Sequence, residues 1–219
     1  MTRSTNWKKY SEHDSIITRM AKKAKAKRAK AKKSKTRYPS PLRIELACGD
    51  HKKDEGYFGV DVAKRDGVDM VVDLEKFPWP FDDNSVSEIV CRHYIEHTKD
   101  IIKFMDEVYR ILKPGSRFVL TAPYWTSIRA WQDPTHTRII SEESFLYFNK
   151  LWREANHLNY YPIKSDFDFT FGFEFYPEWV NRADEARNFA AKHYVNVIAD
   201  IQVLLIKKVP TKKPKKKSS

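Results

Sequence analysis

The sequence predicts an α/β protein whose mostly parallel sheet has helices on both faces and ends in an antiparallel strand pair. Two patterns support this fold class. Short apolar segments alternate with amphipathic helical segments over residues 42–152, as in sheets built from parallel strands. Two longer segments with apolar residues at every second position follow between residues 167 and 205, which is typical of antiparallel strands.

The first half of the domain is predicted to supply four short strands. Their apolar runs lie at residues 42–47, 57–61, 68–73 and 87–92. Only residues 50–56 separate the first strand from the second, whereas a parallel crossover normally takes a dozen or more residues. We therefore expect the first connecting helix to be a single turn at most.

An amphipathic helix is predicted over residues 100–112, because its apolar residues recur at three- and four-residue spacing. Thr98 is expected to cap this helix, with Asp100 at its positive end. The sequence Lys113-Pro114-Gly115 should end it, and a fifth strand is predicted over residues 117–122.

The end of the domain changes from helical to strand patterning. Ser141 is predicted to cap a helix that runs to about Trp152. Phenylalanines alternate with other residues over 167–173, and the same period returns over 195–205, so these two segments should form the terminal antiparallel pair. Residues 177–192 between them are expected to be a helical or irregular insertion.

Charge divides the chain into three parts. Residues 1–38 contain 14 Lys and Arg against two acids, residues 207–219 contain seven Lys and no acid, and residues 39–206 contain 20 bases and 27 acids. The domain predicted over 39–209 is therefore acidic, and residues 1–38 and 210–219 are predicted to be disordered lysine-rich extensions. Such extensions bind phosphates without sequence preference, keep the protein in solution or act as nuclear-import signals.

Several features of the sequence indicate the cellular compartment of the protein. No apolar stretch approaches the roughly 20 residues of a membrane span, and no apolar region of a secretory signal follows the basic N-terminus. Cys48 and Cys91 lie in apolar runs and are expected to be free, buried thiols. We expect a soluble cytoplasmic protein without a membrane partner, or a nuclear one if the source is eukaryotic.

A ligand site is predicted where the first two strands end. The first strand runs into Ala47-Cys48-Gly49-Asp50, and Asp61 ends the second. Small residues at 47 and 49 allow a ligand to approach the backbone closely, and an acid at 61 can accept hydrogen bonds from both hydroxyls of a ribose. This arrangement is typical of nucleotide sites at the carboxyl ends of parallel strands.

A series of further motifs follows in order. They occupy residues 56–61, 73–81, 83–86, 96–97, 112–115 and 133–138. In these motifs the chain resembles small class I, Rossmann-like methyltransferases that use S-adenosylmethionine (SAM), of the subfamily with Asp-Leu-x-x-x-Pro-x-Pro-Phe and Asp-Pro-Thr-His-x-Arg motifs. The resemblance covers about residues 42–148 and implies an enzyme with SAM as its cofactor.

The resemblance also implies which residues contact SAM. They are Glu45, Ala47 and Gly49 at the methionine part, Asp61 at the ribose hydroxyls, Asp73 and Leu74 at the adenine, and Arg92 at the sulfonium. His93 would face the sulfonium and the substrate, which makes it a candidate catalytic residue. The usual Gly-x-Gly-x-Gly turn lacks its first and third glycines here, and His51 at the third position would narrow the pocket or reach into it.

Residues after the fifth strand are candidates for the substrate site. His136 lies in Asp133-Pro134-Thr135-His136, which is either a turn or the source of a general base, because the pKa of an imidazole suits proton removal near neutral pH. Tyr124, Trp125 and Trp131 either stack on a planar substrate or close the pocket. Arg138 completes the predicted substrate set.

Two other patterns favour a structural interpretation. Residues 93–97 match H-x-x-E-H, the inverted zinc-protease signature, but that signature requires one helix, and His93 directly follows a strand. The sequence also offers no evident third ligand, so no metal site is predicted. Cys91 lies inside an apolar strand and is expected to be a core residue rather than a nucleophile.

The sequence thus predicts a SAM-dependent methyltransferase whose acceptor is a nucleic acid or nucleoprotein reached through the basic extensions. Two alternatives stay open. One is a methyltransferase for small molecules or glycans whose extensions serve localisation. The other is a catalytically silent protein of the same fold that binds nucleic acid. The sequence does not determine the methylated atom, the catalytic base or the oligomeric state.

Overall fold

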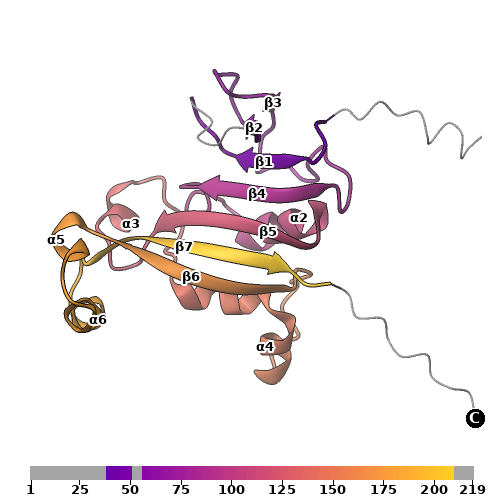
Figure 1. The fold of residues 1–219 in the computed structure, drawn as a ribbon. Helices are drawn as coiled ribbons and strands as arrows, with labels where there is room; N and C mark the ends of the chain where they lie inside the picture. Colours follow the sequence, from indigo (N-terminus) through magenta and orange to yellow (C-terminus); the bar gives the residue numbers. More distant parts are fainter. Residues whose placement is uncertain (1–37, 51–55, 210–219) are drawn as a thin grey trace, which may run out of the picture. The chain divides into compact units, whose positions relative to one another are not determined.

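The computed structural model describes residues 38–50 and 56–209. The described residues from Pro41 to Val209 are built around a seven-stranded sheet of order β3-β2-β1-β4-β5-β7-β6 (Figure 1). The strands are β1 (Arg43–Leu46), β2 (Phe58–Asp61), β3 (Met70–Val71), β4 (Val86–Arg92), β5 (Leu112–Pro123), β6 (Phe167–Phe175) and β7 (Ile198–Lys207). All pairings among β1 to β5 are parallel, whereas β7 runs antiparallel to β5 and β6. The predicted fold class is confirmed.

The helical segments of the described residues are short. They are α2 (Ile101–Ile111), α3 (Arg129–Gln132), the 3-10 helix η1 (Glu142–Phe148), α4 (Lys150–Ala155), α5 (Pro177–Val180) and α6 (Asp184–His193). In the described part of the chain, none of the helices has the length and apolar character needed to cross a bilayer. The helical insertion expected between the last two strands is confirmed by α5 and α6.

The core lies between the sheet and α2. Strand register places Ile44, Ile89, Phe118 and Leu205 in one row across four strands, and all four side chains are fully buried. Phe104 of α2 packs on this face, with its ring centroid 6.4 Å from that of Phe118. The amphipathic pattern of residues 100–112 therefore predicts the helix correctly, because its apolar stripe has a sheet to cover.

The start of α2 differs from the prediction. Asp100, not Thr98, is the N-cap, and its Oδ1 accepts a hydrogen bond of 3.0 Å from the Lys103 amide. That backbone donor lowers the pKa of Asp100. Thr98 instead directs its carbonyl to the loop after β5, where Arg138 donates to it, so the residue joins two loops rather than capping a helix.

The helix predicted from Ser141 to Trp152 is wrong as a single element. It is interrupted at Asn149, where η1 ends and α4 begins. The Asn149 side chain accepts a hydrogen bond from the Trp152 amide, and its Nδ2 donates to the Phe167 carbonyl. An asparagine that caps a new helix and anchors it to β6 competes with continued helical pairing.

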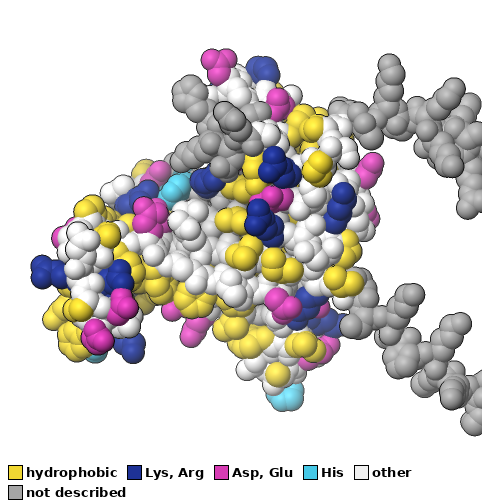
Figure 2. Space-filling view, in the orientation of Figure 1, with side chains coloured by type: hydrophobic (Ala, Val, Ile, Leu, Met, Phe, Trp, Pro, Cys, Tyr) yellow, Lys and Arg dark blue, Asp and Glu magenta, His cyan; other side chains and the backbone are white. Residues whose placement is uncertain are grey.

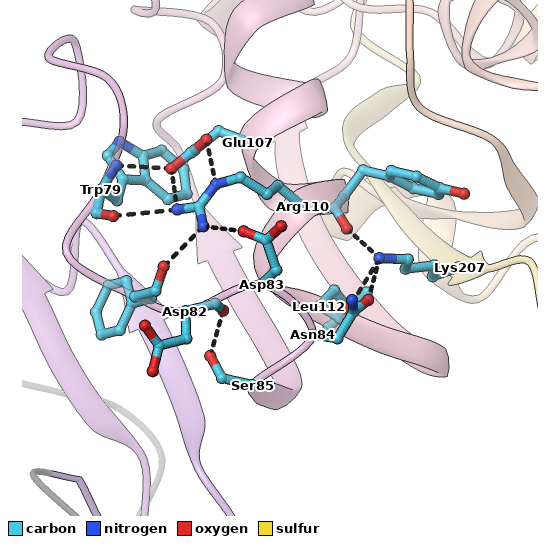
Figure 3. Close-up of polar contacts among 11 residues, drawn as sticks. Trp79, Asp82, Asp83, Asn84, Ser85, Glu107, Arg110, Leu112 and Lys207 are labelled. Carbon is cyan, nitrogen blue, oxygen red and sulfur yellow. Dashed lines mark hydrogen bonds and ion pairs between the residues drawn. The ribbon is translucent and has the colours of Figure 1, made fainter. Parts of the chain in front are cut away.

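Arg110 of α2 fixes the segment between β3 and β4. Its guanidinium donates to the carbonyls of Phe81 and Trp79, at 2.8 and 3.1 Å, and pairs with Asp83 and Glu107, each at 2.6 Å (Figure 3). The nearly buried Glu107 carboxylate in turn accepts a hydrogen bond of 2.6 Å from the Trp79 amide. The Pro-Trp-Pro-Phe and Asp-Asn-Ser-Val motifs therefore have a structural role in this chain.

Lys207 closes the same region from the last strand. Its ammonium group is buried and donates to Asn84 Oδ1 at 2.8 Å and to the Leu112 carbonyl at 2.9 Å (Figure 3). Burial lowers the pKa of Lys207. The end of β7 is thus joined to the segment that leads into β4 and to the start of β5.

Strand register also fixes where the chain enters and leaves the sheet. Arg43 of β1, Glu88 of β4, Arg117 of β5 and Ile206 of β7 lie in one row. The first strand therefore begins at the same edge of the sheet at which the last strand ends. The carboxyl ends of the parallel strands lie at the opposite edge.

Candidate functional site

The turn after β1 has the backbone shape of a ligand-binding loop. Ala47 and Gly49 both have positive φ, at 51° and 67°. The Gly49 amide donates to Asp61 Oδ2 at 2.9 Å, which ties the turn to the end of β2. Space beside Gly49 is open, since a Cβ built there meets no described atom within 4 Å. His51 lies outside the described residues.

Gly59 allows the backbone around this turn to pack closely. A Cβ at position 59 would overlap the Gly67 carbonyl oxygen and lie 3.0 Å from Cys48 Sγ. The Gly59 amide donates to Asp69 Oδ2 at 2.7 Å. A residue without a side chain is therefore required here, although no local sequence signal distinguishes this glycine.

Glu45 and Arg92 form an ion pair behind the turn. They come from neighbouring strands, β1 and β4, and Arg92 Nη1 lies 2.9 Å from Glu45 Oε1. The Glu45 side chain is 3% exposed and that of Arg92 is 28% exposed. The pair places a carboxylate and a guanidinium at the ends of the two central strands, where the resemblance implies the methionine part and the sulfonium of SAM.

Asp73 and Leu74 follow β3 and differ in how accessible their side chains are to a ligand. The Asp73 carboxylate accepts a hydrogen bond from the Glu75 amide, which lowers the pKa of Asp73, and it lies 3.2 Å from Lys76 Nζ. Its side chain is 36% exposed and can accept a further hydrogen bond. Leu74 is buried, and its carbonyl accepts a hydrogen bond from the Trp79 indole.

His93 lies at the end of β4 between two acids. Its backbone has a φ of 52°, its Nδ1 is 3.6 Å from Glu96 Oε1, and its Nε2 is 3.7 Å from Asp200 Oδ2. Asp200 comes from β7, is buried, and accepts a 2.8 Å hydrogen bond from Arg129. Burial raises the pKa of Asp200. Asp200 and Arg129 were not predicted as site residues; an acid inside an apolar strand was the available signal.

Tyr124 and Trp125 line a cavity of about 580 Å³ beyond the end of β5. Glu142 and Glu143 of η1 and Lys192 of α6 line it as well. The Tyr124 hydroxyl donates to Glu142 Oε2 at 2.8 Å, and burial raises the pKa of Tyr124 to about 12. The phenol is therefore neutral near pH 7 and serves as a hydrogen-bond donor.

The other predicted substrate residues lie apart from this cavity wall. Trp131 is 64% exposed, and its indole donates to the Trp125 carbonyl at 3.0 Å. Arg138 donates to the Thr98 carbonyl, and burial lowers its pKa. Arg138 also borders a different, mainly apolar cavity of about 290 Å³ beside α2. The structure thus places Tyr124 and Trp125 together and leaves Arg138 outside their cavity.

His136 is held in the loop after α3. Its Nδ1 lies 3.0 Å from the Ala130 carbonyl, and its ring contacts that of His97 edge to face at 4.6 Å between centroids. Its Nε2 is 3.9 Å from Asp133 Oδ2. His136 therefore contacts His97, the last residue of the H-x-x-E-H sequence. That sequence forms turns rather than a helix.

Comparisons with known proteins agree with this architecture. Residues 16–120 match the family model described as a methyltransferase domain. A SAM-dependent methyltransferase from Archaeoglobus fulgidus has a TM-score of 0.53 and 18% identity, over 92% of this chain and 100% of that one. A Thermotoga maritima structure, described as a SAM-dependent methyltransferase and possible histamine N-methyltransferase, has a TM-score of 0.50 and 17% identity, over 80% and 85% of the chains.

A third similar structure is geranyl diphosphate C-methyltransferase from Streptomyces coelicolor, with a TM-score of 0.51 and 14% identity over 78% of this chain and 70% of that one. No curated protein matches the sequence. The fold is therefore one that SAM-dependent methyltransferases share, and residues 16–120 match a methyltransferase domain. The predicted enzyme class and the predicted cofactor, SAM, are confirmed.

Proposed function

We propose that SAM lies along the carboxyl ends of β1, β2 and β4. The acids there suit its polar groups: Asp61 can accept from the ribose hydroxyls and Asp73 from the adenine amine, while Glu45 lies at the methionine end. The Asp61 carboxylate already accepts two backbone hydrogen bonds, from the Gly49 amide at Oδ2 and the Ala63 amide at Oδ1, but a carboxylate has about four acceptor positions. The open space beside Gly49 supports this placement.

Asp61→Asn tests the placement of the ribose. The amide oxygen can still accept from the Gly49 amide, but the charged acceptor for two hydroxyls is lost, so calorimetry should show SAM affinity reduced by about tenfold or more. Asp69→Asn is the matched control, because the Asp69 carboxylate also accepts a hydrogen bond from a glycine amide, that of Gly59 in β2. Equal losses in both variants would contradict the assignment of Asp61.

When bound, SAM would supply a methyl group to an acceptor atom that attacks the methyl carbon in line with the C–S bond, with S-adenosylhomocysteine as the leaving group, and the protein would mainly position the acceptor. The acceptor that we propose belongs to a nucleic acid or nucleoprotein. The excess of basic residues in 1–38 and 207–219 supports this, because lysines neutralise phosphates while residues 39–206 carry more acids than bases. The acceptor group itself would enter beside Tyr124 and Trp125.

Transfer of radiolabelled methyl groups to separate RNA, DNA, protein and small-metabolite fractions tests this proposal. We expect label in a nucleic-acid or nucleoprotein fraction at low salt, and at least a tenfold loss when residues 1–38 and 210–219 are removed. Unchanged labelling and unchanged nucleic-acid affinity after that truncation would contradict it.

A second candidate is a small-molecule acceptor. The cavity of about 580 Å³ lined by Tyr124, Glu142 and Lys192 supports it, since cavities of this size hold single metabolites. Label in the metabolite fraction that persists in the truncated chain would favour this candidate. SAM binding without labelling of any fraction would favour a catalytically silent binding protein.

A further inference from the structure

Three metal-ligating side chains converge where the loops after β4 and β5 meet. Glu96, His97 and His136 each contribute one ligand atom, and these atoms lie within 4.8 Å of one another. Glu96 and His97 belong to the loop after β4, and His136 to the loop that follows α3. We propose that these three residues bind a divalent transition-metal ion.

Neighbouring groups fix which ring nitrogens can bind the ion. The Ala130 carbonyl, an acceptor, lies 3.0 Å from His136 Nδ1, so that nitrogen carries the proton and Nε2 keeps its lone pair. The Thr135 hydroxyl donates to Asp133 Oδ1 at 2.7 Å and therefore accepts from His97 Nδ1 at 3.0 Å. Both imidazoles thus offer Nε2, in the arrangement typical of metal-binding histidines.

The Glu96 carboxylate supplies the second, independent observation. Its side chain is 3% exposed, and among the described residues its Oε2 has no hydrogen-bond partner. A buried carboxylate oxygen without a partner costs free energy unless a cation or a proton satisfies it. His93 Nδ1 lies 3.6 Å from the other oxygen, Oε1, and so leaves Oε2 available to a metal ion.

The two loops are held together independently of the three ligands. The Thr137 amide donates to the Glu96 carbonyl at 2.8 Å, and the Thr137 hydroxyl donates to the Thr98 carbonyl at 2.8 Å. Arg138 Nε donates to the same Thr98 carbonyl at 3.2 Å. Backbone contacts on either side of the ligands therefore define the geometry that a metal site needs.

The ligand set favours a first-row ion over magnesium or calcium. Two imidazoles and one carboxylate suit Zn²⁺, Co²⁺ or Fe²⁺, whereas the harder cations prefer oxygen ligands. Ligands around a tetrahedral ion stand roughly 3.3 Å apart, given metal–ligand distances near 2.0–2.1 Å. The ligand atoms, now up to 4.8 Å apart, would draw in by as much as about 1.5 Å through rotation of side chains, of which that of His136 is 8% exposed.

The experiment uses the full chain, stripped with a chelator and titrated with Zn²⁺ in a calorimeter and with Co²⁺ in a spectrophotometer, without SAM. We expect one tightly bound equivalent and visible Co²⁺ absorption. Glu96→Gln, His97→Gln and His136→Gln should each weaken binding by more than about 100-fold, because loss of a mere supporting residue costs 10–100-fold. Thr135→Val, which removes the acceptor for His97 Nδ1, should weaken it about tenfold.

His193→Gln at the end of α6 is the control and should bind within about twofold of the unaltered chain. Melting temperatures in chelator check folding, and a variant that melts as the unaltered chain does yet loses the Co²⁺ spectrum supports the site. Absence of Co²⁺ absorption in the unaltered chain would overturn the proposal. Equal metal affinity in the unaltered chain and the three ligand variants would overturn it too.

Discussion

Arg92 Nη1 lies 2.9 Å from Glu45 Oε1, and this ion pair joins the two central strands at their carboxyl ends. The Glu45 side chain is almost completely buried. A buried carboxylate without its cation is strongly unfavourable, so the pair acts as a unit.

Arg92→Met should lower the free energy of unfolding by about 2–4 kcal/mol, because it leaves Glu45 buried without its guanidinium. The double variant Glu45→Gln, Arg92→Met should lose less than the sum of the two single variants. Urea denaturation of the unaltered chain, the single variants Glu45→Gln and Arg92→Met, and the double variant completes the double-mutant cycle. Strict additivity would mean that the two residues do not depend on each other.

Gly59→Ala should destabilise the protein by about 2–3 kcal/mol, because the new methyl group overlaps the Gly67 carbonyl oxygen and the backbone must shift. Gly172→Ala on β6 is the matched control, since a Cβ there meets no described atom within 4 Å. The urea midpoint should fall only in the first variant. A fall of the same size in both would argue against a close backbone approach at Gly59.

Arg110→Met should lower the free energy of unfolding by about 2–4 kcal/mol, because it removes the cation beside Glu107 and the donors to two carbonyl groups. Lys103→Met on the same helix breaks only an exposed pair with Asp100 and should change stability by less than about 1 kcal/mol. Thermal melting compares the two. If Lys103→Met costs as much as Arg110→Met, the Arg110 contacts are not the cause.

Asp200 should make stability depend on pH. Burial raises its pKa, although His93 and Arg129 oppose this rise and Glu174 adds to it. The folded chain therefore holds the Asp200 proton more tightly than the unfolded chain does. The stability that this proton contributes is fully present below the unfolded pKa, near 3.9, and is lost as the pH rises through the folded value.

Asp200→Asn cannot ionise, so its stability relative to the unaltered chain should be greater at pH 7 than at pH 3.5. Urea midpoints at both values measure the difference. Asp82→Asn, at an exposed position, is the control and should show a smaller change. A larger advantage for Asp200→Asn at pH 3.5 would show that the pKa is lowered, not raised.

The strands could be predicted from sequence because apolar runs between small or acidic residues are local signals. The prediction of a single helix after Ser141 was wrong, and the cause is a contact with a residue far along the chain. Asn149 donates to the Phe167 carbonyl of β6, and no local pattern reveals that partner. The cap of α2 was misplaced by two residues, since Thr98 and Asp100 both have suitable side chains.

Part of the candidate site was predictable because it also depends on local signals. Residues 45–49 and Asp61 follow strands directly, so their meeting at one edge follows from the parallel sheet. Asp200 and His136 reach their neighbours only through tertiary contacts with Arg129 and with the loop of Glu96. No further ligand was evident beside the H-x-x-E-H sequence because His136, which lies near Glu96 and His97, comes from a separate loop.

The register of β7 separates the points where the chain enters and leaves the sheet from the proposed SAM site. Arg43 at the start of β1 and Lys207 at the end of β7 lie at one end of the parallel strands, while the proposed SAM site lies at the other end. The ten residues of β7 span roughly 30 Å at about 3.3 Å per residue. A nucleic-acid strand needs about nine nucleotides to cover that distance. An acceptor held near the end of β7 must therefore be at least about that long to reach the proposed SAM site.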